Sequence, residues 1–121
     1  MVTRSVADSQ LLQVELGRME AQYASLIAGA RAAAAAFDEA LSGPEAGLVG
    51  AATNMRAICD QVTEACQTIV ARCLRQAGAG AIMPGNPLER LQRDMTVAAQ
   101  HYMIGDNAYE ALGQLQLGMA P

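Results

Sequence analysis

Apolar residues recur over the first third of the chain in alternating steps of four and three, which is the repeat of a helix packed along one face. The repeat is formed by Leu12, Leu16, Met19, Tyr23, Leu26, Ala30, Ala33 and Phe37. Asp8 or Ser9 can cap the first amides of such a helix. Gly43 and Pro44 end it, because glycine permits a left-handed cap and proline cannot continue a helix. The pattern predicts a long helix from about Ser9 to Leu41.

The same repeat returns after Pro44 and predicts a second long helix. Its members are Met55, Cys59, Val62, Cys66, Ile69 and Cys73. The helix is expected to run from Pro44 or Glu45 to Gln76. Two glycines weaken its first turns by up to about 1 kcal/mol each relative to alanine, so a later start at Ala51 stays an alternative.

Residues 78–87 interrupt the helical pattern. Three glycines and two prolines within these ten residues exclude a helix, and the apolar middle of the loop is expected to lie against protein or ligand. A third helix begins after it, with Asn86 as N-cap, Pro87 at the first position and Glu89 at the third. This helix is expected to end near Gly105 and to bury Leu88, Leu91, Met95, Ala98 and Tyr102.

A short fourth helix is expected from Asp106 to Leu117, with a core face formed by Tyr109, Leu112 and Leu115 or Gln116. Each helix has one apolar face that must be buried against another, and short connections favour antiparallel neighbours. The sequence therefore predicts an all-α fold, a four-helix up-and-down bundle over residues 9–118, with a flexible N-terminus at 1–8 and a tail at 119–121. The long helices overhang the short ones, so we expect an oligomer or a further domain to cover their ends.

Composition and charge narrow the classes of function. Hydrophobic residues make up 52% of the 121 residues, and aromatic residues make up 3%. A net charge of -4 without a basic run disfavours nucleic acid as a partner. No apolar stretch approaches the roughly 20 residues that span a bilayer, and the first residues lack the apolar core of a signal peptide. We therefore expect a cytoplasmic protein that binds neither nucleic acid nor membrane.

The three cysteines are spaced by seven residues. On a helix, Cys59, Cys66 and Cys73 would share one face at separations of about 10 Å. That separation is too long for a disulfide and for ligands of one metal ion. Buried thiols behave as small apolar side chains, so we expect all three in the core. The chain also lacks the Glu-x-x-His pairs of a di-iron bundle, and no metal site is predicted.

One segment is specific enough to indicate a family. Arg75-Gln76-Ala77-Gly78-Ala79-Gly80-Ala81 is followed, after six residues, by Leu88-Glu89-Arg90-Leu91-Gln92-Arg93-Asp94, and then by His101. Together with Pro87, this string resembles the glycine loop and the Pro-apolar-Glu-basic-apolar-x-Arg-Asp helix start of the C-terminal helical domain of acyl-CoA dehydrogenases. The order and length of the helices agree, so the resemblance covers nearly the whole chain. Ala79 departs from it, because a second glycine is usual there.

The resemblance implies a flavoprotein. Complete members have an N-terminal helical domain, a middle β-domain and this bundle, and FAD lies between the last two, with a neighbouring subunit's loop on its adenosine diphosphate part. By this register Arg75, Gly78 and Gly80 are candidates for cofactor contact, since loop amides can approach a phosphate closely and an arginine can pair with it. Alternatively, Gly78 only caps the second helix and Arg75 is solvated. FAD or FMN is expected only in a complete assembly, and none on the isolated chain.

The position of the family's catalytic glutamate is altered. In many dehydrogenases of the family that glutamate lies eight residues after the Arg-Asp pair, where this chain has Tyr102. His101, the only histidine, is the candidate catalytic base instead, as the resemblance to the flavin-dependent monooxygenase branch implies. Imidazoles titrate close to neutral pH, which suits a general base. We expect His101 on one face of the third helix with Arg90, Asp94 and Val97; a histidine favoured only by the helix dipole is the alternative.

Two further polar features have plain explanations. Arg93 and Asp94 are adjacent and cannot face each other on a helix, so each is expected to form a structural ion pair with another partner. Tyr109-Glu110 resembles a family pair but comes too late in the sequence, and Glu110 is expected to be a solvated helix residue.

Two functions follow as alternatives. The first is a domain or subunit of a flavin-dependent oxidoreductase, closer to the monooxygenase branch because of Arg75 and His101. It requires a homo-oligomer or a partner chain that carries the missing flavin-binding domains. The second is a non-enzymatic helical bundle that serves as a dimerisation or scaffold module without a cofactor. Binding of a small molecule in the bundle is a weaker third alternative.

Overall fold

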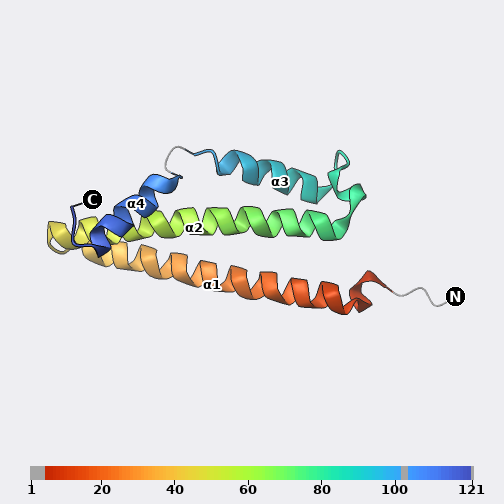
Figure 1. Cartoon of the computed structure of the whole chain (residues 1–121), viewed down its shortest axis with the longest axis horizontal. Coiled ribbons are helices and arrows are strands. Elements are labelled where there is room, and N and C mark those ends of the chain that lie inside the picture. The colour runs from red at the N-terminus through yellow and green to blue at the C-terminus, as the bar shows by residue number, and fades with distance from the viewer. Residues whose placement is uncertain (1–4, 102–103, 121) are drawn as a thin grey trace.

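The computed structural model describes residues 5–101 and 104–120, and these residues form helices and turns with no strand among them (Figure 1). In chain order the elements are η1 (Val6–Asp8), α1 (Gln10–Ala40), α2 (Glu45–Ala77), η2 (Ala79–Ile82), α3 (Pro87–Ala98) and α4 (Asp106–Gln116). The predicted all-α fold is confirmed. Two details differ from the prediction: η2 is a short 3-10 helix where none was expected, and α3 ends well before Gly105.

Local signals account for the starts of the helices. Ser9 caps α1 by accepting a hydrogen bond from the Leu12 N–H at 3.4 Å. Asn86 caps α3 by accepting one from the Leu88 N–H at 2.9 Å. α2 begins directly after Pro44, so the two glycines in its first turns are helical and the later start does not occur.

α2 is the central helix of the fold (Figure 1). α1 packs antiparallel along it, while α3 and α4 also contact α2 but make no close backbone contact with α1 or with each other in the described residues. α3 covers the C-terminal half of α2, where a cavity of about 30 Å³ is lined by Gln67, Val70, Gln92, Met95 and Thr96. α4 covers the N-terminal half, with Leu115 beside Gly50. The two short helices therefore follow one another along α2.

The predicted stripe of α1 is largely confirmed: six of its residues are buried or half-buried, namely Leu12, Met19, Leu26, Ala30, Ala33 and Phe37. Met19 is buried, as predicted, but Leu16 and Tyr23 are 58% and 48% exposed, so their predicted place in the core is wrong. Glu15 and Gln22 are half-buried instead. An apolar periodicity cannot identify these two polar residues as part of the packed face. An apolar strip of α1 is therefore left outside the contact with α2.

The stripe of α3 differs from the prediction at two residues. Met95 is half-buried, but Leu91 and Ala98 are exposed, which contradicts the prediction for both. Gln92 is half-buried in their place, against α2. Tyr102, also predicted in this stripe, lies outside the described residues.

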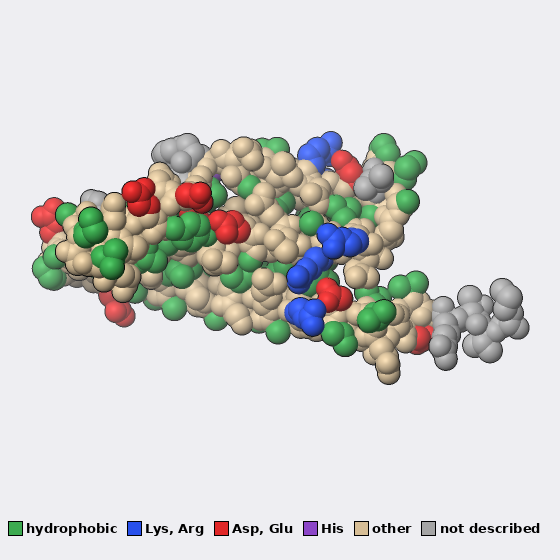
Figure 2. Space-filling model, in the orientation of Figure 1, with side chains coloured by type: hydrophobic (Ala, Val, Ile, Leu, Met, Phe, Trp, Pro, Cys, Tyr) green, Lys and Arg blue, Asp and Glu red, His purple; other side chains and the backbone are tan. Residues whose placement is uncertain are grey.

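The core is small and consists mainly of alanine. In the described part of the chain, the buried apolar residues are Met19, Ala33, Ala57, Ala65, Ala81 and Ala108. Alanine lets helix axes approach closely, but each methyl group removes little apolar area from water. Larger side chains are exposed, and hydrophobic side chains follow much of α1 on the face shown in Figure 2. The chain is thus an open set of helices whose outer faces it does not cover itself.

The cysteines lie only partly in the core. Cys66 and Cys73 are half-buried, and the Cys73 Sγ is 3.9 Å from the Met19 Sδ at the contact between α1 and α2. Cys59 is exposed, so its predicted burial is wrong. A seven-residue repeat drifts by about 20° per heptad on a straight helix, and this drift carries Cys59 away from the packed face.

Candidate functional site

The corner between α2 and η2 holds the three residues that the sequence nominates for cofactor contact. Arg75 is exposed in the last turn of α2. Gly78 ends the helix by donating its N–H to the Leu74 carbonyl at 3.2 Å. Its φ of 80° and ψ of -168° form a conformation that is open almost only to glycine. The helix end therefore accounts for Gly78 without any ligand.

The described residues offer no such explanation for Gly80. It is not among the glycines with positive φ, and a Cβ placed on it would meet no atom within 4 Å. The amides of Ala79 and Gly80 open η2, where a helix supplies no acceptor, and no side chain caps them. These exposed amides, with Arg75 nearby in sequence, form a corner that can receive an anion from outside the chain.

The rest of the loop contacts the chain at some positions and is exposed at others. Ala81 is 2% exposed, and the Asn86 Nδ2 donates to the Gly80 carbonyl at 3.4 Å. Met83 points outward and is 61% exposed. The expectation that the loop lies against protein or ligand is therefore met within the chain by Ala81, and it stays a prediction for Met83.

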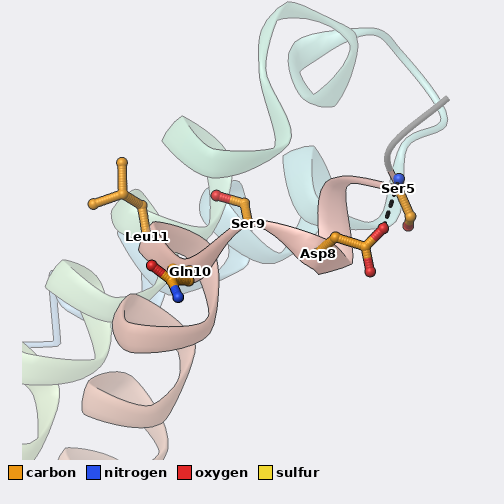
Figure 3. Close-up of a pocket in the computed structure, with 5 residues that line it drawn as sticks. All are labelled: Ser5, Asp8, Ser9, Gln10 and Leu11. Atoms are coloured by element: carbon orange, nitrogen blue, oxygen red, sulfur yellow. Dashed lines mark hydrogen bonds between the residues drawn. The ribbon is translucent and has the colours of Figure 1, made fainter. Parts of the chain in front are cut away.

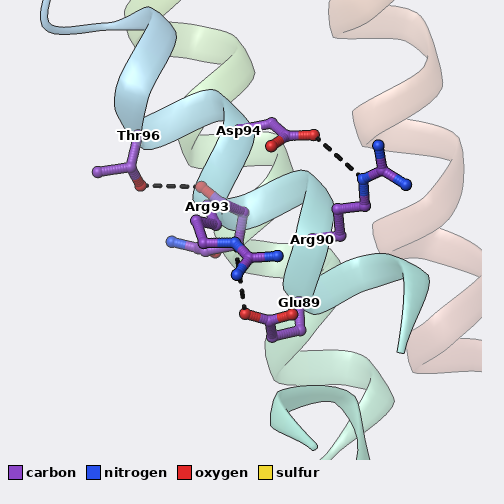
Figure 4. A network of polar contacts seen from close by, with 6 residues as sticks. Glu89, Arg90, Arg93, Asp94 and Thr96 are labelled. Carbon is purple, nitrogen blue, oxygen red and sulfur yellow. Dashed lines mark hydrogen bonds and ion pairs between the residues drawn. The ribbon is translucent and has the colours of Figure 1, made fainter. Parts of the chain in front are cut away.

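Arg93 and Asp94 each pair with a residue one turn away on α3, as predicted. The Arg93 Nε lies 3.8 Å from the Glu89 Oε1, and the Arg90 Nε lies 3.7 Å from the Asp94 Oδ2 (Figure 4). Such exposed pairs contribute little to stability. They border a hollow of about 600 Å³ on α3 that is also lined by Gly85, Asn86, Pro87 and Leu91.

His101 lies in the connection between α3 and α4 rather than on α3. The helix closes with short-range bonds, because the N–H groups of Gln100 and His101 donate to the carbonyls of Val97 and Ala98 at 3.0 and 3.2 Å. The predicted helical face shared with Arg90, Asp94 and Val97 is therefore wrong. His101 is exposed, and its carbonyl accepts a hydrogen bond from the Ile104 N–H at 2.9 Å.

The structure keeps His101 apart from the glycine corner. Arg75, Gly78 and Gly80 lie at the start of α3 and His101 at its end (Figure 1). The helix has 12 residues, so it separates the two regions by about 18 Å. One chain therefore presents two distinct regions rather than a single compact site.

The interface between α2 and α4 holds a polar cluster that the sequence reasoning missed. Asp60 is 1% exposed, and its Oδ2 accepts a hydrogen bond from the Gly105 N–H at 3.2 Å. The Arg56 Nε, the Asp60 Oδ1 and the Tyr109 hydroxyl are buried without hydrogen-bond partners in the described structure. Glu64 lies close enough to affect the Tyr109 phenol without completing a hydrogen bond. In the sequence, this cluster was indicated only by the carboxylate of Asp60, which stands among the apolar residues of α2.

The remaining hollow of note lies at the N-terminal end. It measures about 690 Å³ and is lined by Ser5, Asp8, Ser9, Gln10 and Leu11 (Figure 3). The Ser5 N–H donates to the Asp8 Oδ2 at 3.0 Å, so these groups serve to cap η1. Within the described residues, no three His, Cys, Asp or Glu side chains gather in a way that could hold a metal ion. None of the described helices combines the length and apolar character needed to cross a membrane.

Comparison with known proteins gives this geometry a context. The sequence matches the family described as "Acyl-CoA dehydrogenase, C-terminal domain" over residues 1–105. It is similar to the indole-3-acetate monooxygenase of Acinetobacter baumannii, with 28% identity over 85 residues, which cover 70% of this chain and 22% of that protein. The chain thus spans only about a fifth of that relative's length. No solved structure matches the chain. The relative is a monooxygenase, which agrees with the branch that the sequence favoured.

Tyr109 gives the polar cluster a measurable signature. Burial raises the pKa of Tyr109 to about 12, and the carboxylates of Glu64, Asp60 and Asp106 add to the rise. The unfolded chain has the ordinary pKa of 10.0, so between pH 10 and 12 the folded state binds the phenol proton more tightly. The free energy of unfolding is therefore expected to fall as the pH rises through this window. Tyr109→Phe should remove that part of the fall in urea titrations; an identical pH dependence in both chains would contradict the assignment.

Proposed function

Because this chain belongs to the acyl-CoA dehydrogenase family, through the C-terminal domain of that family, we propose that it is the helical part of a flavin-dependent oxidoreductase of the monooxygenase-like branch. The observation that carries the proposal is the corner of α2 and η2, where the packing of the described residues does not require a glycine at position 80. The bound flavin, FAD or FMN, would supply the redox chemistry. The residues of this chain would hold its phosphate and orient the substrate.

The corner offers the chemistry that a phosphate requires. The amides of Ala79 and Gly80 have no helical acceptor and no side-chain cap, and a glycine lets a bulky anion approach the backbone. Arg75 can pair with a phosphate in bidentate fashion. Arginine side chains gather in the half of the molecule that holds η2 in the view of Figure 2. Their charge would favour an anion at this end.

His101 is the proposed base on the substrate. Its exposed position in the connection after α3 lets it face a cleft formed with another domain. The length of α3 separates it from the glycine corner, so the two regions are proposed to serve different parts of the assembly. By the family resemblance, the corner of one subunit would contact the cofactor of a neighbour, while His101 would face the reacting part of a flavin held by its own subunit's missing domains.

The exposed apolar strip of α1 supports an assembly of this kind. Leu16 and Tyr23 lie two turns apart on one side of this helix, and both are exposed. A helix that is apolar on both its packed and its free sides is normally buried on both. We propose that a second copy of the chain or a chain with the flavin-binding domains covers this strip. A scaffold module without cofactor would also use the strip, so flavin binding distinguishes the two functions.

Paired glycine substitutions test the cofactor corner. Gly80→Ala should leave the free energy of unfolding unchanged or raise it by up to about 1 kcal/mol, because the unfolded chain loses freedom and nothing clashes. It should lower the amount of yellow flavin retained when the chain is co-expressed with its flavin-binding partner. Gly78→Ala is the matched control, and should cost about 1–3 kcal/mol because alanine strains at this φ and ψ. Full flavin retention by Gly80→Ala, or no flavin with any partner, would contradict the proposal.

Substitutions on α1 test the assembly. Leu16→Lys with Tyr23→Lys should weaken association with the partner or with a second copy by at least about tenfold, which corresponds to 1.4 kcal/mol. Both side chains are exposed in the single chain, so its circular dichroism should not change. Leu117→Lys, at a more exposed apolar position just after α4, is the control. Sedimentation velocity measures the outcome, and unaltered association in the double variant would exclude this strip as the interface.

A further inference from the structure

The contact between α2 and α3 buries little apolar surface. None of the 12 residues of α3 is fully buried, and Leu91 and Val97 are exposed. Because packing of an apolar face supplies most of the stability of a helix in a protein, a polar contact with α2 matters more for α3 than it would for a well-buried helix. The polar residue that lies against α2 is Gln92.

Gln92 carries a buried polar atom that the described residues leave unpaired. Its side-chain Oε1 is shielded from solvent and accepts no hydrogen bond within that part of the chain. Buried polar groups in proteins are nearly always hydrogen-bonded, either to protein or to ordered water. A methionine of similar length would fill this place without an unpaired acceptor, so packing alone does not explain a glutamine here.

The cavity beside Gln92 has the size and the lining of a water site. It measures about 30 Å³ and is lined by Gln67 and Val70 of α2 and by Gln92, Met95 and Thr96 of α3. One water molecule needs roughly 10–15 Å³, so one or two can enter. Pockets for organic ligands measure roughly 300–1,000 Å³, which excludes such a ligand here. Three of the five lining side chains are polar, whereas cavities that stay dry are apolar.

The three polar side chains match the hydrogen bonds of one water molecule. The Thr96 hydroxyl donates to the Gln92 backbone carbonyl at 2.8 Å, so its Oγ1 can still accept a proton from water (Figure 4). The Gln92 Oε1 can accept the second proton, and the Gln67 side-chain amide can donate to the water oxygen. About three hydrogen bonds are usual for a buried water. The site therefore offers one donor and two acceptors to a single molecule.

We propose that an ordered water molecule binds in this cavity and joins α3 to α2 through Gln92 and Gln67. The Gln92 Oε1 accepts no direct hydrogen bond from Gln67, so the water is the link between them. This contact also explains why α3 turns a glutamine, rather than Leu91, towards α2. The proposal involves neither flavin nor a partner and is independent of the proposed function.

The test uses the full chain in solution. Gln92→Met removes the acceptor at similar volume, and Gln67→Met removes the donor on α2. Gln61→Met makes the same change at an exposed position of α2 and is the matched control. One readout is the folding equilibrium constant from urea titrations of the two single variants, the double variant and the control. The other is the nuclear Overhauser effect between water and the Met95 methyl group in the unaltered chain.

The Met95 methyl group should show a water signal of the sign that marks a bound molecule. Gln92→Met and Gln67→Met should each lower the folding equilibrium constant about fivefold, since each removes a hydrogen bond. The double variant should lower it little further, because both residues act through the same water, and the control should leave it unchanged.

Equal or greater stability of Gln92→Met would overturn the proposal, because methionine improves the site only if the acceptor has no partner. Additive losses in the double variant would exclude the link between the two glutamines. The absence of a bound-water signal at Met95 would also overturn the proposal, and this readout decides the matter if Gln92→Met does not fold.

Discussion

α2 is the only helix of the described chain with neighbours on two sides, and the fold depends on the small residues that let these neighbours approach it. Ala57 and Ala65 are buried on α2, facing helices whose own buried residues are largely alanine. Close approach is gained at the expense of apolar area, because a methyl group removes little surface from water. The larger apolar side chains lie on the outer faces. This exposed apolar surface is the basis of the proposal that other protein completes the core.

The same constraint shapes the two candidate functional regions. Both lie where a short segment joins helices that pack on α2: the glycine corner at its C-terminal end, and the His101 connection between the two short helices. Neither region is enclosed by the chain itself. Gly80 and His101 are both exposed, and each faces space that another domain or subunit would fill. This arrangement agrees with membership of a family in which the helical domain is one part of a larger enzyme.

The sequence was sufficient for the helices and only partly sufficient for their faces. Caps such as Asn86 act over a few residues, so the starts of the helices were predictable. The packed face of α1 was predictable except at Leu16 and Tyr23. Glu15 and Gln22 are half-buried in their place, and an apolar periodicity does not identify polar residues on a packed face. The early end of α3 was also missed, and it too is associated with a contact between distant parts of the sequence. The contact of Gly105 with Asp60 joins residues that are distant in sequence, and periodicity carries no information about it.

The thermal unfolding midpoint, measured as a function of protein concentration and of added flavin-binding partner, tests the central claim most directly. Surface that is covered only in the assembly makes stability depend on the concentration of the species that covers it. The account predicts a midpoint that rises with chain concentration or with added partner. A midpoint that stays constant under both conditions would contradict it, because the chain would then be complete as a single copy.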